Sequence, residues 1–282
     1  MARNANDRFD IRIPTLEEES KLFNNPFTQD FLEEELDFYG LTHRYTKGGI
    51  DVRMVKPTGR VDDYLNKNFR IGNVKVPVLT VDGALWMSLT NMEIQSMFVP
   101  LCMTHGVVGT AGLGLGYYAL RAASMDRVDR VEVYEMNPGV IRYFTDVFGD
   151  RREMSKIEIF EGDAREGLLK RPYDLVFMDI YQTLLGDEVV DDARTFMRHS
   201  MAEEYRFWGQ EKVLLDALVE RDRNRPRPNL CEEAFFRAWE GTKEPIDPRN
   251  PDGEKYRLAD LYEPATDREF RTKVFEALGI GR

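Results

Sequence analysis

Between residues 107 and 179, short apolar runs alternate with longer stretches whose apolar residues recur at helical spacing. Short apolar runs bounded by turn residues predict buried strands, and the amphipathic stretches between them predict helices. The predicted strands begin at Val107 and continue at Arg130–Tyr134, Ile157–Phe160 and Tyr173–Met178, with helices at about 117–124 and 138–148. Strands that alternate with helices in this way predict a Rossmann-like α/β fold with a doubly wound, mostly parallel sheet.

The chain before this alternation follows a different pattern. A capping box at Thr15 opens a first helix, and a second helix is predicted from Thr28 to Tyr39, where Gly40 ends it. Short β-like runs between glycine-rich turns then predict a small antiparallel sheet, which includes strands at Ile50–Val55, Phe69–Ile71, Val74–Val81 and Leu85–Met87. The pair Asp82-Gly83 is its strongest hairpin signal. Thr90 and Glu93 form another capping box, which opens a helix that reaches about Met103.

The pattern after Asp179 is less regular. Residues 202–219 are expected to be helical, because Tyr205, Trp208 and several leucines fall near one face, and Asp267–Leu278 reads as an amphipathic helix. No clear pair of strands follows residue 186. The chain is therefore divided into N-terminal helices with a small β-region (1–95), a Rossmann-like cofactor-binding core (96–200) and a mainly helical, atypical C-terminal region (201–282).

Composition excludes several classes of function. The 282 residues carry a formal charge of −11, which repels phosphate backbones, so the sequence gives no strong nucleic-acid signal. The alternating arginines from Arg221 to Arg227 are read as a solvated linker rather than a phosphate-binding strip. Two cysteines and three histidines are too few for recognisable zinc-ligand spacing, so no metal site is expected. Without a signal peptide or a long apolar run, we expect a cytoplasmic protein with no membrane span.

A run of alternating glycines follows the first strand of the α/β region. Gly112, Gly114 and Gly116 stand where a strand turns sharply into a helix. Glycine tolerates positive φ and lets a ligand approach the backbone, and a helix N-terminus offers free amide hydrogens to the ligand. By itself the run also fits a tight turn with close packing of helix on strand.

Acidic residues at the ends of the next three strands make a cofactor site the better interpretation. Glu135 lies nineteen residues after Gly116, where a carboxylate can accept both ribose hydroxyls of an adenosine. Asp163, followed by Ala164, occupies the position from which adenine is contacted. Asp179 ends the fourth strand, at the sheet edge where ligands bind in open α/β folds.

Two cofactors fit the glycines. The segment from Gly114 to Ala119 matches G-x-G-x-x-G/A, so NAD stays open on this motif alone. Alternate glycines directly after the strand, together with Gly162-Asp163-Ala164 and the segment from Tyr173 to Asp179, favour S-adenosylmethionine.

Residues from about 79 to 185 resemble the spermidine synthase branch of the class I S-adenosylmethionine-dependent methyltransferase superfamily. The segments that carry the resemblance are Leu79–Gly83, Val99–Cys102, the glycine run, Val131–Glu135, Glu161–Asp163 and Tyr173–Asp179. The resemblance implies S-adenosylmethionine as cofactor and an N-terminal β-region before the core.

The chain departs from that branch on the acceptor side. Aminopropyltransferases carry an acid within the glycine loop, a glutamine after the Asp-Gly hairpin and a second aspartate after the fourth strand. This chain has Leu115, Trp86 and the segment Ile180–Gln182 at these places. Because a polyamine needs several carboxylates to hold its ammonium groups, aminopropyl transfer to a polyamine is disfavoured.

We therefore expect a methyltransferase that acts on a small molecule or a protein. Methyl transfer is served mainly by positioning and by deprotonation of the acceptor, so Asp179 is the candidate general base or amine anchor and Tyr181 the candidate pocket residue. The alternatives are a non-catalytic binding or structural protein that keeps the fold, an aminopropyltransferase and an NAD-dependent enzyme. The sequence is compatible with a homo-oligomer and does not identify the acceptor.

Overall fold

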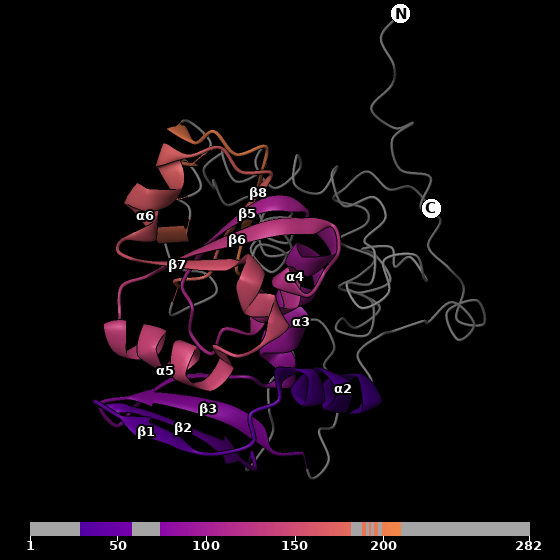
Figure 1. Cartoon of the computed structure of the whole chain (residues 1–282), viewed down its shortest axis with the longest axis vertical. Helices are drawn as coiled ribbons and strands as arrows, with labels where there is room; N and C mark the ends of the chain where they lie inside the picture. Colours follow the sequence, from indigo (N-terminus) through magenta and orange to yellow (C-terminus); the bar gives the residue numbers. More distant parts are fainter. Residues whose placement is uncertain are drawn as a thin grey trace, which may run out of the picture.

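A computed structural model describes residues 29–57, 74–181, 188–189, 192, 195–196 and 199–209 (Figure 1). Several predicted features lie outside the described residues. These are the helix at Thr15, the strand at Phe69–Ile71, the arginine-rich segment and the helix at Asp267–Leu278.

The centre of the fold is a five-stranded parallel sheet. Its strands are β5 (Gly106–Ala111), β6 (Val128–Glu135), β7 (Ile157–Glu161), β8 (Leu175–Met178) and β9 (Glu204–Phe207). Their spatial order is β7-β6-β5-β8-β9, and every neighbouring pair is parallel. Numbered along the chain this is the order 3-2-1-4-5 of a Rossmann-like sheet, so the predicted fold class is confirmed.

Helices connect these strands close to the predicted positions. They are α4 (Tyr117–Ala123), α5 (Pro138–Phe148) and the short α6 (Ala164–Gly167), with 3₁₀ turns η2 (Arg152–Lys156) and η3 (Leu168–Lys170). Helix α5 shows why its start was predictable. Asn137 accepts a hydrogen bond from the Gly139 N–H (2.9 Å), and Pro138 fits the first helical turn, where its missing N–H costs nothing.

The N-terminal region contains an antiparallel sheet of four strands in chain order. They are β1 (Tyr45–Lys47), β2 (Ile50–Val55), β3 (Val76–Val81) and β4 (Ala84–Ser88). Asp82 and Gly83 join β3 to β4 with φ of 51° and 81°, which matches the two-residue hairpin turn that favours positive φ at both positions. The predicted hairpin is confirmed, and β1 is an additional strand joined to β2 through Gly48 and Gly49.

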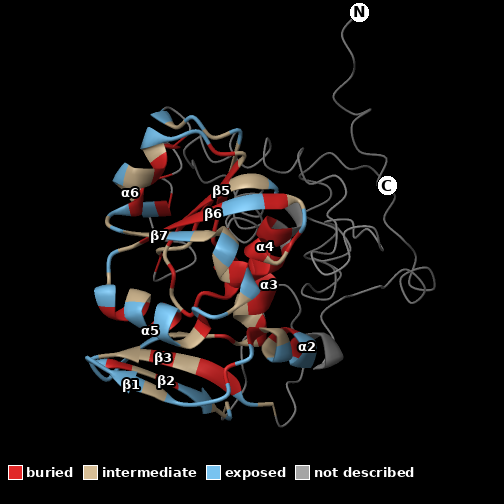
Figure 2. Ribbon diagram, in the orientation of Figure 1, coloured by how far each residue is buried: buried red, intermediate tan, exposed pale blue. Residues whose placement is uncertain are grey.

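Helix α5 lies between the two sheets (Figure 1). On one side it packs against β6 and β7, and on the other it packs against β1 and β2. The rings of Tyr45 and Tyr143 meet edge to face at 5.2 Å, and Gly139 passes so close to Ile50 that a β-carbon would crowd its side chain. Burial is concentrated around the parallel sheet and its helices, while the N-terminal sheet has exposed positions (Figure 2).

Two sequence expectations fail. Thr90 precedes helix α3 (Asn91–Met103) but makes no side-chain capping bond, so Thr90 and Glu93 do not form the predicted capping box. The helix expected from residue 202 is also wrong over Glu204–Phe207, which form β9. Tyr205 and Phe207 favour strands, and the open edge of β8 provides pairing partners that outweigh the weak helical pattern.

Helix α2 (Gln29–Tyr39) is joined to α4 by a buried ion pair. Arg121 Nη2 lies 2.6 Å from Glu35 Oε2, which also accepts a hydrogen bond from the Tyr117 hydroxyl (2.7 Å). The Arg121 guanidinium rests 3.5 Å from the centre of the Phe38 ring. In the part of the chain described, no helix is long and apolar enough to span a membrane.

Glu35→Ala is expected to lower the free energy of unfolding by roughly 3–5 kcal/mol, because it leaves the Arg121 charge buried without its carboxylate. Urea denaturation measures the change. Lys47→Ala is the control, since its ion pair with Asp146 is exposed and should contribute less than about 1 kcal/mol. Equal losses for the two variants would contradict a special role for the buried pair.

Candidate functional site

All five parallel strands end at one edge of the sheet, and the predicted site residues follow those ends. Gly112 follows β5, Glu135 ends β6, Asp163 lies just after β7 and Asp179 follows β8. Ligands of open α/β sheets bind at this edge, near the point where the strand order reverses between β5 and β8.

The glycine run requires glycine for steric reasons within the protein. Gly112, Gly114 and Gly116 have φ of 82°, 51° and 79°. A β-carbon at Gly112 would clash with the carbonyl oxygen of Asp179. The same change at Gly114 would strike the Met87 thioether, and at Gly116 it would strike the ring of Phe144. The loop is therefore closely packed between β8, β4 and α5.

Most backbone amides of this loop bind within the protein. The Gly112 N–H donates to Tyr134 O (2.9 Å), and the Gly116 N–H donates to Leu113 O (2.6 Å). The Leu113 N–H donates to Glu135 Oε2 (2.9 Å), and the Leu115 N–H donates to Met87 Sδ (3.1 Å). The free amides that the sequence pattern predicts at this turn are thus largely engaged.

Glu135 is held rigidly at the end of β6. Its Oε2 accepts from Leu113 in the glycine loop, and its Oε1 accepts from the Asn137 N–H (2.7 Å). The side chain is half-buried, and each carboxylate oxygen can accept more than one hydrogen bond. Glu135 can therefore hold the loop and still accept the two hydroxyls of a ribose.

Asp163 and Ala164 begin helix α6 beside this carboxylate. Asp163 Oδ1 accepts from the Arg165 N–H (2.9 Å) as a helix cap, and Ala164 is buried. The Gly162 N–H donates to the carbonyl of Glu135 (3.0 Å), which ties the two strand ends together. Met136 follows Glu135 and is 68% exposed, so it offers apolar surface that sequence analysis did not single out.

Asp179 and Glu93 are two half-buried carboxylates, and the charge of Asp179 acts on Glu93. Burial raises the pKa of Asp179 to about 7. Burial raises the pKa of Glu93 to about 8, and the negative charge of Asp179 contributes to that rise. Glu93 lies in the first turn of α3, where the sequence pattern suggested a capping role, so its place beside Asp179 was missed.

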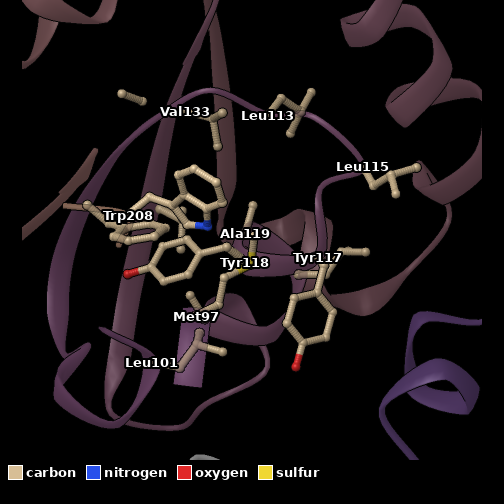
Figure 3. Close-up of a cluster of buried hydrophobic side chains, with 14 of the residues drawn as sticks. Met97, Leu101, Leu113, Leu115, Tyr117, Tyr118, Ala119, Val133 and Trp208 are labelled. Atoms are coloured by element: carbon tan, nitrogen blue, oxygen red, sulfur yellow. The ribbon is translucent and has the colours of Figure 1, made fainter. Parts of the chain in front are cut away.

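Trp208 links these two carboxylates structurally. The backbone N–H of Trp208 donates to Met178 O (2.9 Å), and its indole Nε1 donates to Ser96 Oγ (2.9 Å). A hydrogen bond from the Trp208 side chain to Glu93 opposes the rise in the pKa of Glu93. Figure 3 shows Trp208 in one buried cluster with Tyr118, Met97 and Leu101. The backbone hydrogen bond from Trp208 to Met178 therefore connects the end of β8 to this buried cluster.

The hydroxyl of Tyr181, the second predicted catalytic residue, forms its hydrogen bond with a residue other than Asp179. Its hydroxyl donates to Asp192 Oδ2 (3.1 Å), and Asp192 is also bound by Arg165 Nε at 2.9 Å. Burial and then the Asp192 charge raise the pKa of Tyr181 well above its ordinary value. The structure thus gives Tyr181 a partner that joins the segment after β8 to α6.

Among the described residues, no group of three or more His, Cys, Asp or Glu side chains is arranged to hold a metal ion.

The chain matches no family model and no curated protein. Similar solved structures include a precorrin-8w decarboxylase from Methanobacterium thermoautotrophicum, with 22% identity, 49% of this chain and 74% of that chain covered, and a TM-score of 0.34. A probable spermidine synthase from Corynebacterium glutamicum has 11% identity, covers 57% of this chain and 60% of its own, and gives a TM-score of 0.38. A precorrin-6y C5,15-methyltransferase from Geobacter metallireducens has 17% identity, with coverages of 48% and 73% and a TM-score of 0.35. At these identities and TM-scores the similarity assigns the chain to no family.

Proposed function

We propose that this protein is an S-adenosylmethionine-dependent methyltransferase that acts on a small molecule or a protein. The observation that carries the proposal is the placement of Glu135, which is fixed beside the glycine loop at the end of the strand next to β5. In this arrangement the ribose lies on Glu135, and the adenine lies between Met136 and the Asp163-Ala164 turn. The methionyl end then extends toward the glycine loop and Asp179.

The glycine loop supports S-adenosylmethionine over NAD. A dinucleotide carries a pyrophosphate, which needs several free backbone amides or cationic side chains. Leu113 and Leu115 already donate their amides to Glu135 and Met87, and Glu135 and Asp179, which lie at the strand ends beside the loop, are carboxylates. A cofactor without phosphate avoids this conflict.

The residues at the end of β8 fit the acceptor side of the reaction. When bound, the cofactor supplies an electrophilic methyl group on a sulfonium. Asp179 accepts a proton from the acceptor, and its pKa of about 7 suits a base that works near neutral pH. Trp208 and Tyr118 belong to the buried apolar cluster next to the end of β8.

Titration calorimetry with S-adenosylmethionine, S-adenosylhomocysteine and NAD tests the proposal. We expect both adenosyl ligands to bind and NAD to bind far more weakly. No binding of S-adenosylmethionine at about millimolar concentration, equivalent to about −4 kcal/mol, would overturn it. Tight binding without turnover across a panel of acceptors would favour the non-catalytic alternative.

Met136→Ala tests the placement of the adenine. Removing this exposed thioether side chain is expected to weaken S-adenosylmethionine about tenfold, since apolar contact with the ring is lost. Met201→Ala is the matched control, because Met201 is also exposed but precedes β9, at the opposite edge of the sheet. Equal effects of the two changes would place the adenine elsewhere.

A further inference from the structure

The peptide groups of Leu115, in the middle of the glycine run, are held from both sides by the N-terminal region. The Leu115 N–H donates to Met87 Sδ (3.1 Å) in β4, and the Leu115 carbonyl accepts from the Tyr39 hydroxyl (2.7 Å) at the end of α2. The side chains of Leu115 and Tyr39 are completely buried. Tyr39 therefore contacts the glycine loop at Leu115, a residue more than seventy positions away in the sequence.

Tyr39 is itself fixed by a second hydroxyl. Its oxygen lies 2.6 Å from the Tyr143 hydroxyl in α5. Because the single proton of Tyr39 is donated to Leu115, Tyr143 donates to Tyr39. Burial raises the pKa of both phenols well above their ordinary values, so this chain of hydrogen bonds persists at physiological pH. The Tyr39 ring also packs against Phe148, with 5.0 Å between centroids.

The loop needs such external support. Its three glycines have positive φ and would explore many other conformations in an unconstrained chain. Met87 fills the space beside Gly114, and Phe144 fills the space beside Gly116. Packing alone does not fix the orientation of the two peptide groups that flank Leu115. The hydrogen bonds with Tyr39 and Met87 fix that orientation.

We propose that Tyr39 and Met87 are positioning residues that shape the glycine loop for the methionyl end of the cofactor. This inference rests on the proposed function. With the ribose on Glu135 and the adenine toward β7, the remaining part of the ligand extends to the loop that these two residues hold. Affinity for the amino-acid part of the ligand is then set by residues outside the parallel-sheet core.

Tyr39→Phe tests the proposal, since it keeps the ring and removes only the hydroxyl. We expect the Kd of S-adenosylmethionine and of S-adenosylhomocysteine to rise about tenfold, the change typical of one lost buried hydrogen bond. The Kd of 5′-methylthioadenosine, which has the same adenosine but lacks the amino-acid group, should change less than about twofold. A general loosening of the fold would weaken all three ligands alike.

Met87→Leu is the second variant, because it keeps an apolar side chain of similar volume and removes the sulfur acceptor. Met87→Leu should also weaken S-adenosylmethionine relative to 5′-methylthioadenosine. If Tyr39→Phe fails to fold, Met87→Leu alone tests the proposal. Tyr45→Phe is the matched control. Its hydroxyl also anchors the N-terminal region to α5, through Asp146, but does not reach the loop.

The outcomes separate the two proposals. If the wild-type protein binds S-adenosylmethionine and neither variant changes its affinity relative to 5′-methylthioadenosine, the positioning role is refuted while the proposed function stands. If the wild-type protein does not bind S-adenosylmethionine, the proposed function fails and this inference fails with it.

Discussion

Glu135→Ala is expected to abolish measurable binding of S-adenosylmethionine while the protein remains folded. The carboxylate would accept both ribose hydroxyls, and a hydrogen bond to a charged group contributes about 1.5–3 kcal/mol. Loss of both corresponds to a decrease in affinity of at least about 100-fold. The structure adds a second reason, because Glu135 also accepts hydrogen bonds from the Leu113 and Asn137 amides. Its loss would therefore also loosen the glycine loop and the turn after β6.

The measurement is calorimetric titration beside circular dichroism, so that binding and folding are read separately. Glu158→Ala is the control, because Glu158 is an exposed carboxylate near the start of β7, away from the carboxyl ends of the strands where Glu135 lies. Glu135→Gln should have an intermediate effect, since an amide keeps one accepting oxygen and loses the charge. Unchanged affinity in Glu135→Ala would show that the ribose does not lie on this residue.

Asp179→Asn is expected to reduce methyl transfer by about 10²–10⁴-fold and yet leave cofactor binding largely intact. The amide fills the same space but cannot take a proton, and general base catalysis typically contributes a factor of this size. In the wild-type protein the rate should rise with pH through about 7, where Asp179 loses its proton.

The same change is expected to stabilise the protein at neutral pH. Folding raises the pKa of Asp179 from 3.8 to about 7, so between these values the folded state holds a proton that the unfolded state releases. Wild-type stability therefore falls as pH rises through this window, and Asp179→Asn should avoid the loss, which at about 1.4 kcal/mol per pKa unit amounts to roughly 4 kcal/mol. Thermal unfolding across this pH range measures it.

Glu203→Gln provides the control for both readouts, because Glu203 is an exposed carboxylate just before β9, at the opposite edge of the sheet. It should alter neither the rate nor the dependence of unfolding on pH. Full activity in Asp179→Asn would exclude Asp179 as the base, and a pH dependence of unfolding equal to that of the wild-type protein would contradict the raised pKa of Asp179.

The sequence predicted elements whose signals are local. Helix α5 begins and ends at the predicted residues because Pro138 marks its start and its apolar positions repeat regularly to Phe148. Strand β2 matches Ile50–Val55 for a similar reason. Strand β9 was missed because its four residues become a strand through pairing with β8, a tertiary contact that a local pattern does not encode.

In the candidate site, too, some features were predictable from the sequence and others depend on packing between elements. The positions of Glu135, Asp163 and Asp179 at one edge follow from parallel strands, whose carboxyl ends lie together. The pairing of Glu93 with Asp179 and the bond from Tyr181 to Asp192 depend on how separate elements pack. No spacing rule predicts these contacts, so the sequence found the edge of the sheet but not the neighbours of each carboxylate.

The position of α5 between the two sheets has a consequence for how the molecule comes apart. Helix α5 covers part of each sheet. If the two sheets separated, the apolar surface that α5 covers on at least one of them would be exposed to water. The boundary predicted near residue 95 separates two patterns of sequence, and because α5 contacts strands on both sides of it, we expect the two parts to unfold together. We therefore expect a fragment cut at that boundary to expose the apolar surface that α5 covers and to aggregate.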